Sequence, residues 1–507
     1  MSSASEGLKV ISFLRRAANL FPDKLVVQDE MSISYNQLYS IVMKLSSSLE
    51  QIGVKKGDVV GVADWNSIRF LAFLYSSALS GFIIYPVNIR LPPEHIVYTL
   101  RNSECKWLFV SEDFAPLASK SGLPPERVLL MRGKDDFGVK LGSDVHMEDY
   151  ISGHDPYSIL YTSGTTGMPK GVLYTNDRVV LGGMSIVYQL GLFNTSAKLT
   201  SEDVIMPLIP FYHLWAWGSP YHAAYLGAKY VLGGRFSAET TIDFILKHKV
   251  TWLNAIPTMI YQLLSSPRGE ELKGLDRGLK VLVGGSPVPK GLADMMERFG
   301  IRYSTIYGGT DMLATAVQLK KDKQSNSIHP VPFVDVKVVR PDGGEARRGE
   351  MGELLIRAPW LPEGYYKDEA RTAASFSEGW FRTGDVARLD EDGGIEILDR
   401  VKDVVKSGGE WIPTSILESL ISEVKGVASV AVIAKSDQKW GERPVAIIKP
   451  REKGEGLEQA VTTRLKEAAS NGKIASFWIP EELIFVDDIP LTSVGKIDKK
   501  VLKERYG

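Results

Sequence analysis

The segment Tyr161–Gly171 combines three glycines, four Ser or Thr hydroxyls and one lysine. These residue types suit a phosphate-binding loop, because glycines let backbone N–H groups approach a polyphosphate and Lys170 adds a positive charge. The residues expected to form the loop are Thr162, Ser163, Gly164, Thr165, Thr166, Gly167 and Lys170. The same composition also occurs in ordinary surface turns. The strand-like run Ser158–Tyr161 favours phosphate binding, since α/β folds hold anions where a loop leaves a strand end.

This loop is not a Walker A motif, because Lys170 follows Pro169 and is not followed by Ser or Thr. It resembles the signature loop of the adenylate-forming enzymes, which include acyl-CoA synthetases, firefly-type luciferases and the adenylation domains of peptide synthetases. Five later segments match that family in the expected order: Tyr307–Asp311, Trp380–Asp385, Asp399–Asp403, Lys406–Trp411 and Pro490–Ile497. The resemblance covers nearly the whole chain and implies ATP-dependent activation of a carboxylic acid.

The resemblance assigns nucleotide-binding roles along the chain. Gly284, Gly285 and Ser286 would let adenine lie against the backbone, and Tyr307 would cover the ring. Gly308 belongs to the same nucleotide-binding segment. Asp385 would accept the two ribose hydroxyls, with Arg400 as the matching donor. Lys402 and Lys406, from the segment that the family uses as its domain hinge, are the last residues assigned to cofactor binding. Asp311 takes the place of the family's Mg²⁺-binding glutamate, and its shorter arm requires a closer backbone or an intervening water.

Catalytic roles follow from the same resemblance. Lys496 would neutralise the carboxylate and α-phosphate oxygens as they meet, and Thr310 and His213 would assist. For the second half-reaction, a rotation about Lys402 would bring Gly408, Gly409 and Trp411 to the active site, where glycines leave room for the pantetheine arm of CoA. The cations that follow Lys496 are expected on a solvated helix face: Lys499, Lys500, Lys503 and Arg505.

The segment Pro210–Gly218 lies where the family builds its acyl pocket. Tyr212 stands where amino-acid adenylation domains usually carry an aspartate, so an amino-acid substrate would lack a counter-charge. The spacing of His213 and Trp217 is most similar to medium- and long-chain fatty acyl-CoA synthetases, in which the tryptophan gates an apolar channel. A short, hydroxylated or aromatic acid remains an alternative, as does a luciferase-like enzyme. A non-enzymatic AMP-binding module would predict loss of Lys496 or the hinge motif, and both are present.

Composition narrows the remaining classes. The 507 residues carry 60 Lys and Arg against 61 Asp and Glu, so no net field favours nucleic acid or an anionic membrane. The single cysteine, Cys105, excludes an internal disulfide and indicates an intracellular, cytoplasmic protein, with the thiol packed inside. The N-terminus lacks the pattern of a signal peptide. The apolar run Phe70–Val87 is interrupted by polar residues and glycine, which predicts a buried helix and then a strand instead of a membrane span.

Helical patterns alternate with short β-branched runs through the first two thirds, which is typical of an α/β fold. We expect a large N-terminal domain, residues 1–399, with stacked α/β sheets and a small β-rich subdomain at 328–398. A small mobile α+β domain, residues 400–507, should follow a hinge near Lys402. The expected partners are a carboxylic acid, ATP, Mg²⁺ and CoA, and a homodimer is left open.

Overall fold

The computed structural model describes residues 7–142, 151–162, 167–319, 327–452, 456–490 and 497–507. It divides into two compact units. Unit 1 comprises Met1–Asp335 and Arg357–Phe381, and unit 2 comprises Val336–Ile356 and Arg382–Gly507. The expected boundary at residue 400 stays a prediction. Among the described residues, no helix has both the length and the apolar character that a membrane crossing requires.

Unit 1 contains a nine-stranded sheet whose central strands are parallel. In sheet order its strands are β15 (His329–Pro330), β14 (Leu313–Val317), β13 (Arg302–Gly309), β12 (Lys280–Val283), β11 (Trp252–Ala255), β9 (Val204–Pro207), β10 (Lys229–Leu232), β1 (Leu25–Gln28) and β2 (Met31–Ser34). Antiparallel pairs occur only toward its two edges, at β13–β14–β15 and β1–β2. The mostly parallel pattern confirms the expected α/β class.

A second sheet of unit 1 has six strands. In sheet order they are β6 (Val128–Met131), β5 (Cys105–Ser111), β3 (Val59–Ala63), β4 (Ile83–Pro86), β7 (Pro156–Tyr161) and β8 (Gly171–Thr175). All pairs are parallel except β7–β8, which is a hairpin closed by the predicted phosphate loop. The loop therefore leaves the end of a buried strand, as the sequence predicted.

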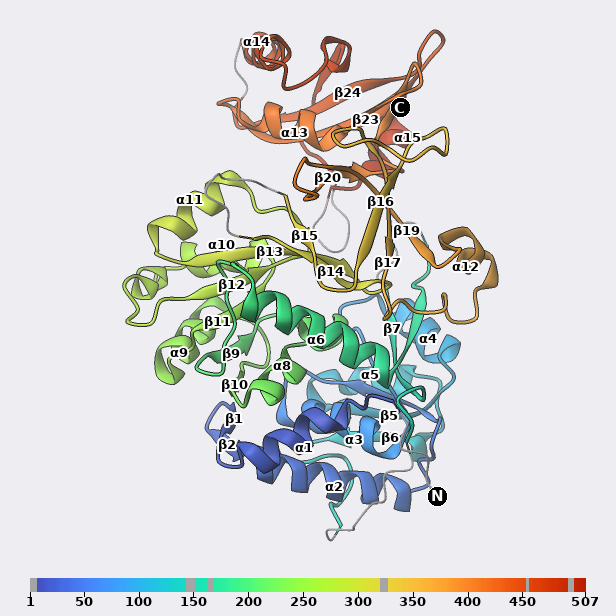
Figure 1. The fold of residues 1–507 in the computed structure, drawn as a ribbon, viewed down its shortest axis with the longest axis vertical. Coiled ribbons are helices and arrows are strands. Elements are labelled where there is room, and N and C mark those ends of the chain that lie inside the picture. The colour runs from blue at the N-terminus through green and yellow to red at the C-terminus, as the bar shows by residue number, and fades with distance from the viewer. Residues whose placement is uncertain (1–6, 143–150, 163–166, 320–326, 453–455, 491–496) are drawn as a thin grey trace. The chain divides into compact units, whose positions relative to one another are not determined.

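Helices separate and cover the two sheets (Figure 1). They are α1 (Ile11–Leu20), α2 (Tyr35–Gln51), α3 (Ile68–Ser80), α4 (Pro93–Asn102), α5 (Ala115–Lys120), α6 (Asn176–Leu192), α7 (Leu214–Trp217), α8 (Ser219–Leu226), α9 (Ala238–His248), α10 (Pro257–Ser265) and α11 (Lys290–Arg298). The short helix α12 (Glu369–Ser375) instead contacts the strand β18 (Phe376–Ser377) of the β-rich region. The largest apolar cluster joins α1, α3, α6 and α8 to strands of both sheets. A second cluster packs α9, α10 and α11 on the outer face of the nine-stranded sheet, and a third packs α4 and α5 on the six-stranded sheet.

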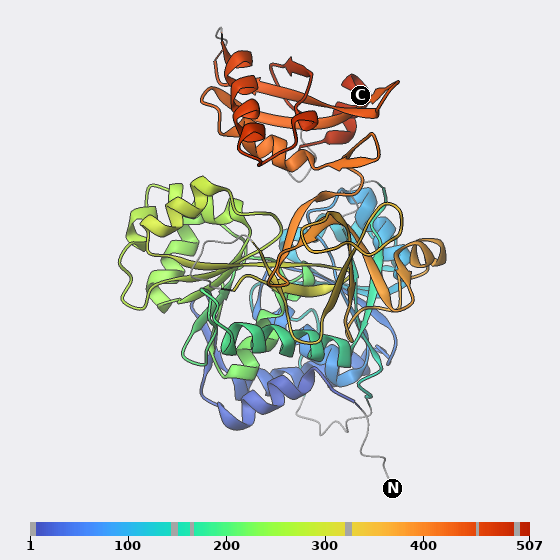
Figure 2. The ribbon, with the colours of Figure 1, turned by 45° about the horizontal axis from the view of Figure 1, so that its top comes forward.

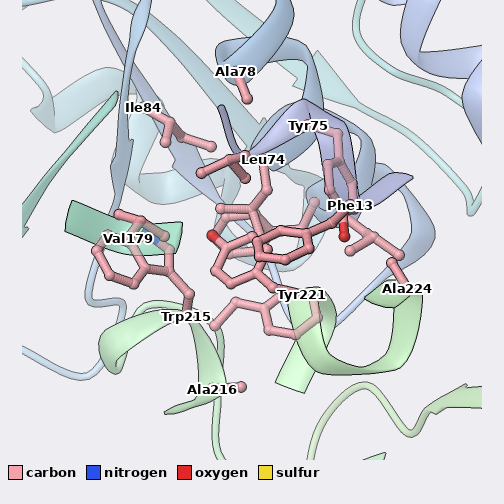
Figure 3. Packing of buried hydrophobic residues seen from close by; sticks show 14 of the residues in the cluster. Phe13, Leu74, Tyr75, Ala78, Ile84, Val179, Trp215, Ala216, Tyr221 and Ala224 are labelled. Carbon is pink, nitrogen blue, oxygen red and sulfur yellow. The ribbon is translucent and has the colours of Figure 1, made fainter. Parts of the chain in front are cut away.

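The central cluster is rich in aromatic rings, as Figure 3 shows around Trp215. Trp215 lies 5.9 Å from Tyr157 and 6.4 Å from Tyr221, centroid to centroid. Phe13 of α1 lies 6.1 Å from the same Tyr221. Each such ring contributes about 1.5–3 kcal/mol by burial. This cluster fixes the start of the predicted acyl-binding segment to the centre of unit 1.

The apolar run Phe70–Val87 forms the expected helix and strand. Ser67 caps α3 by accepting a hydrogen bond from the Phe70 N–H, and Gly81 ends the helix with φ 73°. The chain then enters β4, in the middle of the six-stranded sheet. Nearly all of α3 is buried inside the protein, so its hydrophobicity reflects the core.

The remaining strands form two further sheets. The β-rich region comprises β16 (Asp335–Val339), β17 (Gly352–Arg357), β18 (Phe376–Ser377), β19 (Trp380–Leu389) and β20 (Ile395–Arg400). The C-terminal sheet comprises β21 (Val405–Ser407), β22 (Glu410–Ile412), β23 (Val427–Asp437), β24 (Gly441–Pro450) and β25 (Glu482–Phe485). Helices α13 (Thr414–Ser422) and α14 (Leu457–Ser470) pack on one face of β23 and β24, and α15 (Lys499–Tyr506) packs on the other (Figure 2). The predicted α+β module is thus present.

Candidate active site

The two ends of the predicted phosphate loop are joined by backbone pairing. The Thr162 N–H donates to the Lys170 carbonyl at 2.9 Å, and the Thr162 hydroxyl accepts from the Lys170 N–H at 3.4 Å. Gly167 is exposed between them. Ser163, Gly164, Thr165 and Thr166 lie outside the described residues. The described ends start and finish on neighbouring strands of a buried hairpin, which gives the loop a fixed base.

Tyr365 links the lysine of this loop to the predicted metal ligand. The Lys170 Nζ lies 4.5 Å from the centroid of the Tyr365 ring, and the Tyr365 hydroxyl donates to Asp311 Oδ2 at 2.7 Å. The next residue, Tyr366, donates its backbone N–H to the Gly171 carbonyl at 2.8 Å. Burial, followed by the negative charge of Asp311, raises the pKa of Tyr365, so its hydroxyl stays a donor. The sequence reasoning missed Tyr365, because neither charge nor spacing marks it.

Asp311 lies in the turn that connects the antiparallel strands β13 and β14. A Cβ at Gly308 would lie 2.1 Å from the Leu313 carbonyl oxygen, so the hairpin requires glycine there. Tyr174 donates its hydroxyl to the Thr310 carbonyl at 2.8 Å, which fixes the residue before Asp311. Tyr365 occupies one carboxylate oxygen of Asp311. A single carboxylate fits Mg²⁺ held mainly by substrate phosphates, and the described residues contain no cluster of three or more His, Cys, Asp or Glu that could hold a metal alone.

The acyl segment contains a left-handed helical turn, α7. Leu214, Trp215, Ala216 and Trp217 have φ of 49°, 44°, 46° and 52°, and Gly218 continues at 78°. Each non-glycine residue in this conformation costs about 1–2 kcal/mol. Such a run persists only where surrounding contacts hold it. The Trp215 Nε1 donates to the Ser158 hydroxyl at 3.1 Å, and Asn254 Nδ2 donates to the Ala216 carbonyl at 2.6 Å.

His213 precedes this turn and has an exposed surface. Its ring lies 4.7 Å from the Tyr212 ring, centroid to centroid. Crowding by protein atoms, and then the charge of Arg90, lower the pKa of His213 to about 4. The imidazole of His213 is therefore neutral at pH 7. Arg90 is a further residue that the sequence reasoning did not identify.

Trp217 meets the predicted adenine segment. A Cβ at Gly284 would lie 2.8 Å from the Trp217 ring atom Cη2 and 2.8 Å from Ile306 Cγ2. The structure therefore brings together a residue expected to bind the acid and one expected to bind the nucleotide. Gly285 has φ 83°, and Ser286 is exposed beyond it. Tyr307 is half-buried at the end of β13.

The predicted ribose pair lies in unit 2. Asp385 is 3 % exposed, and its Oδ1 lies 2.8 Å from the Nε of Arg400. The two residues face each other across the antiparallel strands β19 and β20. The Arg400 side chain remains 55 % exposed. The pairing predicted from the motifs is present, with the carboxylate held inside and the guanidinium at the surface.

The hinge segment is tied to the last helix. The Lys503 Nζ donates to the Lys402 carbonyl at 2.9 Å. The Lys499 Nζ donates to the Thr414 hydroxyl at 2.7 Å and lies 2.7 Å from Glu418 Oε1. The prediction of a solvated position is therefore wrong for Lys499, whose ammonium is largely covered by α13, whereas the Lys503 hydrogen bond is exposed.

The other cations of that helix are exposed, as expected: Lys500 and Arg505. Asp399 caps the neighbouring helix α13, because its Oδ2 accepts from the Thr414 and Ser415 N–H groups at 2.5 and 3.2 Å. Lys496, which should precede this network, lies outside the described residues.

The glycine pair of unit 2 forms a tight turn. Ser407 of β21 pairs with Glu410 of β22, which leaves Gly408 and Gly409 as a two-residue loop with φ 59° and 87°. Both positive φ values are those of a type I′ turn, so the turn itself explains both glycines. The neighbouring Lys406 is exposed, and its N–H donates to Glu442 Oε2 at 2.7 Å.

Trp411 is half-buried and packs against an apolar cluster that includes Val386, Leu398 and Val404. The roles of Gly408, Gly409 and Trp411 toward CoA stay predictions.

Comparisons with known proteins agree with these motifs. The family model described as AMP-binding enzyme matches residues 14–366, and the model described as AMP-binding enzyme C-terminal domain matches residues 417–496. The long-chain-fatty-acid–CoA ligase of Thermus thermophilus is 32 % identical, over 99 % of this chain and 96 % of its own length. The medium-chain-fatty-acid–CoA ligase of Ectopseudomonas oleovorans is 32 % identical, over 92 % and 89 %.

A solved structure has a similar fold. It is the o-succinylbenzoate CoA synthetase of Bacillus subtilis in complex with its acyl-adenylate intermediate. The TM-score is 0.83 at 25 % identity, and the match covers 97 % of each chain.

Proposed function

Because this chain belongs to the AMP-binding enzyme family, and its named relatives are acid–thiol ligases, we propose that it activates a medium- or long-chain fatty acid as the acyl adenylate and transfers the acyl group to CoA. The products are acyl-CoA, AMP and pyrophosphate. The observation that carries the proposal is the Lys170–Tyr365–Asp311 constellation at the base of the phosphate loop. It joins a cation and a carboxylate where ATP phosphates and Mg²⁺ need both charges.

In the first half-reaction a carboxylate oxygen of the acid attacks the α-phosphorus of ATP, and the bond to pyrophosphate breaks. The loop N–H groups, its hydroxyls and Lys170 bind the departing phosphates. Asp311, held by Tyr365, would hold Mg²⁺, which supplies charge neutralisation for the phosphate oxygens. Lys496 stabilises the negative charge that gathers as the two anions meet. Asp385 orients the ribose, and a neutral His213 adds no competing positive charge at the pocket entrance.

In the second half-reaction the CoA sulfur attacks the acyl carbonyl, and AMP leaves with the former carboxylate oxygen. The same site must now accept a pantetheine arm in place of pyrophosphate. Unit 2 carries the residues expected to serve this step: Lys402, Lys406, Gly408, Gly409 and Trp411. We assign them to a rotation about Lys402, since one site serves two reactions with different demands.

The acyl substrate is the finer part of the proposal. Trp217 and the apolar residues of unit 1 favour an apolar chain, as do the two fatty-acid ligases among the relatives. An aromatic acid is the alternative substrate, because the structurally similar o-succinylbenzoate CoA synthetase is named for such an acid. The single buried cysteine fits a cytoplasmic location, and a homodimer stays a prediction.

The test is pyrophosphate release with a panel of saturated, hydroxylated and aromatic acids, followed by thioester formation with CoA. We expect release with medium- or long-chain fatty acids and acyl-CoA only when CoA is added. Lys496→Ala should lose adenylate formation yet still convert supplied acyl-AMP to acyl-CoA. Pyrophosphate release with no acid, or acyl-AMP that accumulates without transfer to CoA in the wild type, would contradict the proposal.

A further inference from the structure

The left-handed turn α7 needs specific support. Four consecutive non-glycine residues have positive φ, from Leu214 to Trp217. L-amino acids adopt this conformation singly and rarely in runs, so contacts from elsewhere must hold the turn. The turn also carries Trp217, the residue expected to line the acyl channel. Whatever holds the turn therefore positions that ring.

Two hydrogen bonds hold the turn, one to Ser158 of the six-stranded sheet and one from Asn254 of the nine-stranded sheet. Trp215 is anchored on the six-stranded sheet, where its Nε1 donates to the Ser158 hydroxyl at 3.1 Å. Asn254, on β11 of the nine-stranded sheet, donates its Nδ2 to the Ala216 carbonyl at 2.6 Å. Trp215 is also held by surrounding aromatic rings, as Figure 3 shows. Asn254 contacts the residue directly before Trp217, so it acts closest to the gate.

The buried position of Asn254 is energetically unfavourable for a polar side chain. It is 0 % exposed, and its strand neighbours Leu253 and Ala255 are apolar and equally buried. Its Oδ1 has no hydrogen-bond partner among the described residues. Burying an amide with one end unpaired is less favourable than burying an apolar side chain of the same size. The useful property of this asparagine is thus its donor, which satisfies the Ala216 carbonyl.

The Trp217 ring is so closely packed that a small shift of the backbone would change its contacts. Its ring packs against Gly284, where a Cβ would approach Cη2 to 2.8 Å, and Gly284 donates its N–H to the Ala255 carbonyl at 3.1 Å. Ala255, the strand residue next to Asn254, thus fixes the position of Gly284, against which the Trp217 ring packs. Asn254 and Ala255 fix the turn and its contact surface from one strand.

We propose that Asn254 is a positioning residue that holds the Ala216 carbonyl, and through it Trp217, so that it sets the length of acyl chain the enzyme prefers. This inference rests on the proposed function, in which Trp217 lines the acyl channel. Loss of the donor would leave the Ala216 carbonyl unsatisfied and let the turn relax. The Trp217 ring would then leave Gly284, and the discrimination between short and long chains would change.

The experiment compares Asn254→Leu, which keeps the side-chain volume, with Asn254→Ser, which keeps a shorter donor. The matched control is Thr315→Val, because Thr315 is buried in the same sheet and its hydroxyl has no partner among the described residues. The measured quantity is the ratio of kcat/KM for palmitate to that for octanoate in pyrophosphate release. We expect a change of about tenfold in this ratio for Asn254→Leu, a smaller change for Asn254→Ser and none for Thr315→Val.

A double-mutant cycle with Trp217→Ala tests whether Asn254 acts through Trp217. In the Trp217→Ala background, Asn254→Leu should leave the ratio unchanged. An unchanged ratio in a folded Asn254 variant would overturn the inference, and so would an equal change in both backgrounds. If the wild type activates neither fatty acid, the proposed substrate class fails, and the same cycle is measured with two accepted acids of different length.

Discussion

Asp385 is almost fully buried, whereas the side chain of its partner Arg400 is half exposed. Asp385→Ala should weaken ATP binding by about 1–3 kcal/mol, because the ribose hydroxyls lose their acceptor. Isothermal titration of ATP measures this directly. The matched control is Glu396→Ala, which removes the exposed Arg388–Glu396 pair from the same β19–β20 hairpin and should leave ATP affinity unchanged. Equal affinities for Asp385→Ala and the wild type would refute the ribose assignment.

Tyr365 holds the carboxylate of Asp311 through one hydroxyl. Tyr365→Phe keeps the ring under Lys170 and against Phe376, so the fold should persist. The Mg²⁺ concentration for half-maximal pyrophosphate release should rise by about tenfold, since the ligand loses its orienting donor. Tyr366→Phe removes the adjacent hydroxyl and serves as the control. An equal Mg²⁺ dependence in the two variants would remove Tyr365 from the site.

Residue types predicted Lys170 as a charged member of the site, and the resemblance to the adenylate-forming enzymes implied Asp311 and Asp385. They did not predict Tyr365, Arg90 or Asn254. The importance of these three lies in contacts between residues far apart in the sequence, such as Tyr365 with Asp311 and Asn254 with Ala216. No local pattern records such a contact. The sequence also predicted that Lys499 is exposed to solvent, but its ammonium is largely covered and pairs with Glu418.

The hairpin of β13 and β14 positions Asp311 by the close approach of its backbone at Gly308. Gly308→Ala should force the two strands apart, lower the thermal midpoint and reduce pyrophosphate release, since overpacking costs about 1–3 kcal/mol. Gly291→Ala at the start of α11 is the control, because a Cβ there would meet no atom within 4 Å. Wild-type stability and activity in Gly308→Ala would contradict this account.

The helix and the strand predicted for the apolar run Phe70–Val87 are present as α3 and β4. Local signals agree with the packing there, since the Ser67 hydroxyl caps the start of α3 and Gly81 ends it. The turn α7 could not be predicted. Leu-Trp-Ala-Trp contains no residue that favours positive φ, and tertiary contacts alone impose it.

At the scale of the whole molecule, the enzyme must run two reactions with one set of residues. Lys402→Pro should still release pyrophosphate but form no acyl-CoA, because proline fixes φ near −65° at the proposed pivot. Proline keeps the carbonyl to which Lys503 donates, so the local structure has its anchor. Single-turnover measurement of both products on one preparation gives the answer.

Lys402→Ala, which keeps the backbone freedom, is the control for loss of the side chain. Normal acyl-CoA formation by the proline variant would place the pivot elsewhere.

The sequence predicted two domains in the chain through its motifs. The division into two compact units assigns Val336–Ile356 and Arg382–Asp399 to the C-terminal part, which a linear boundary at residue 400 does not express.

Because the chain has a single thiol, fluorescence spectroscopy can test the proposed rotation about Lys402. Cys105 is buried in β5, its Sγ donates to the Trp107 carbonyl, and burial raises its pKa to about 12, so it should not react with maleimide dyes at pH 7. Tyr261 of unit 1 and Lys500 of unit 2 are exposed. A Tyr261→Cys, Lys500→Cys variant should therefore take up two dyes, while the native chain takes up none until it unfolds. Energy transfer between those dyes would then follow each turnover without any need to remove a native cysteine.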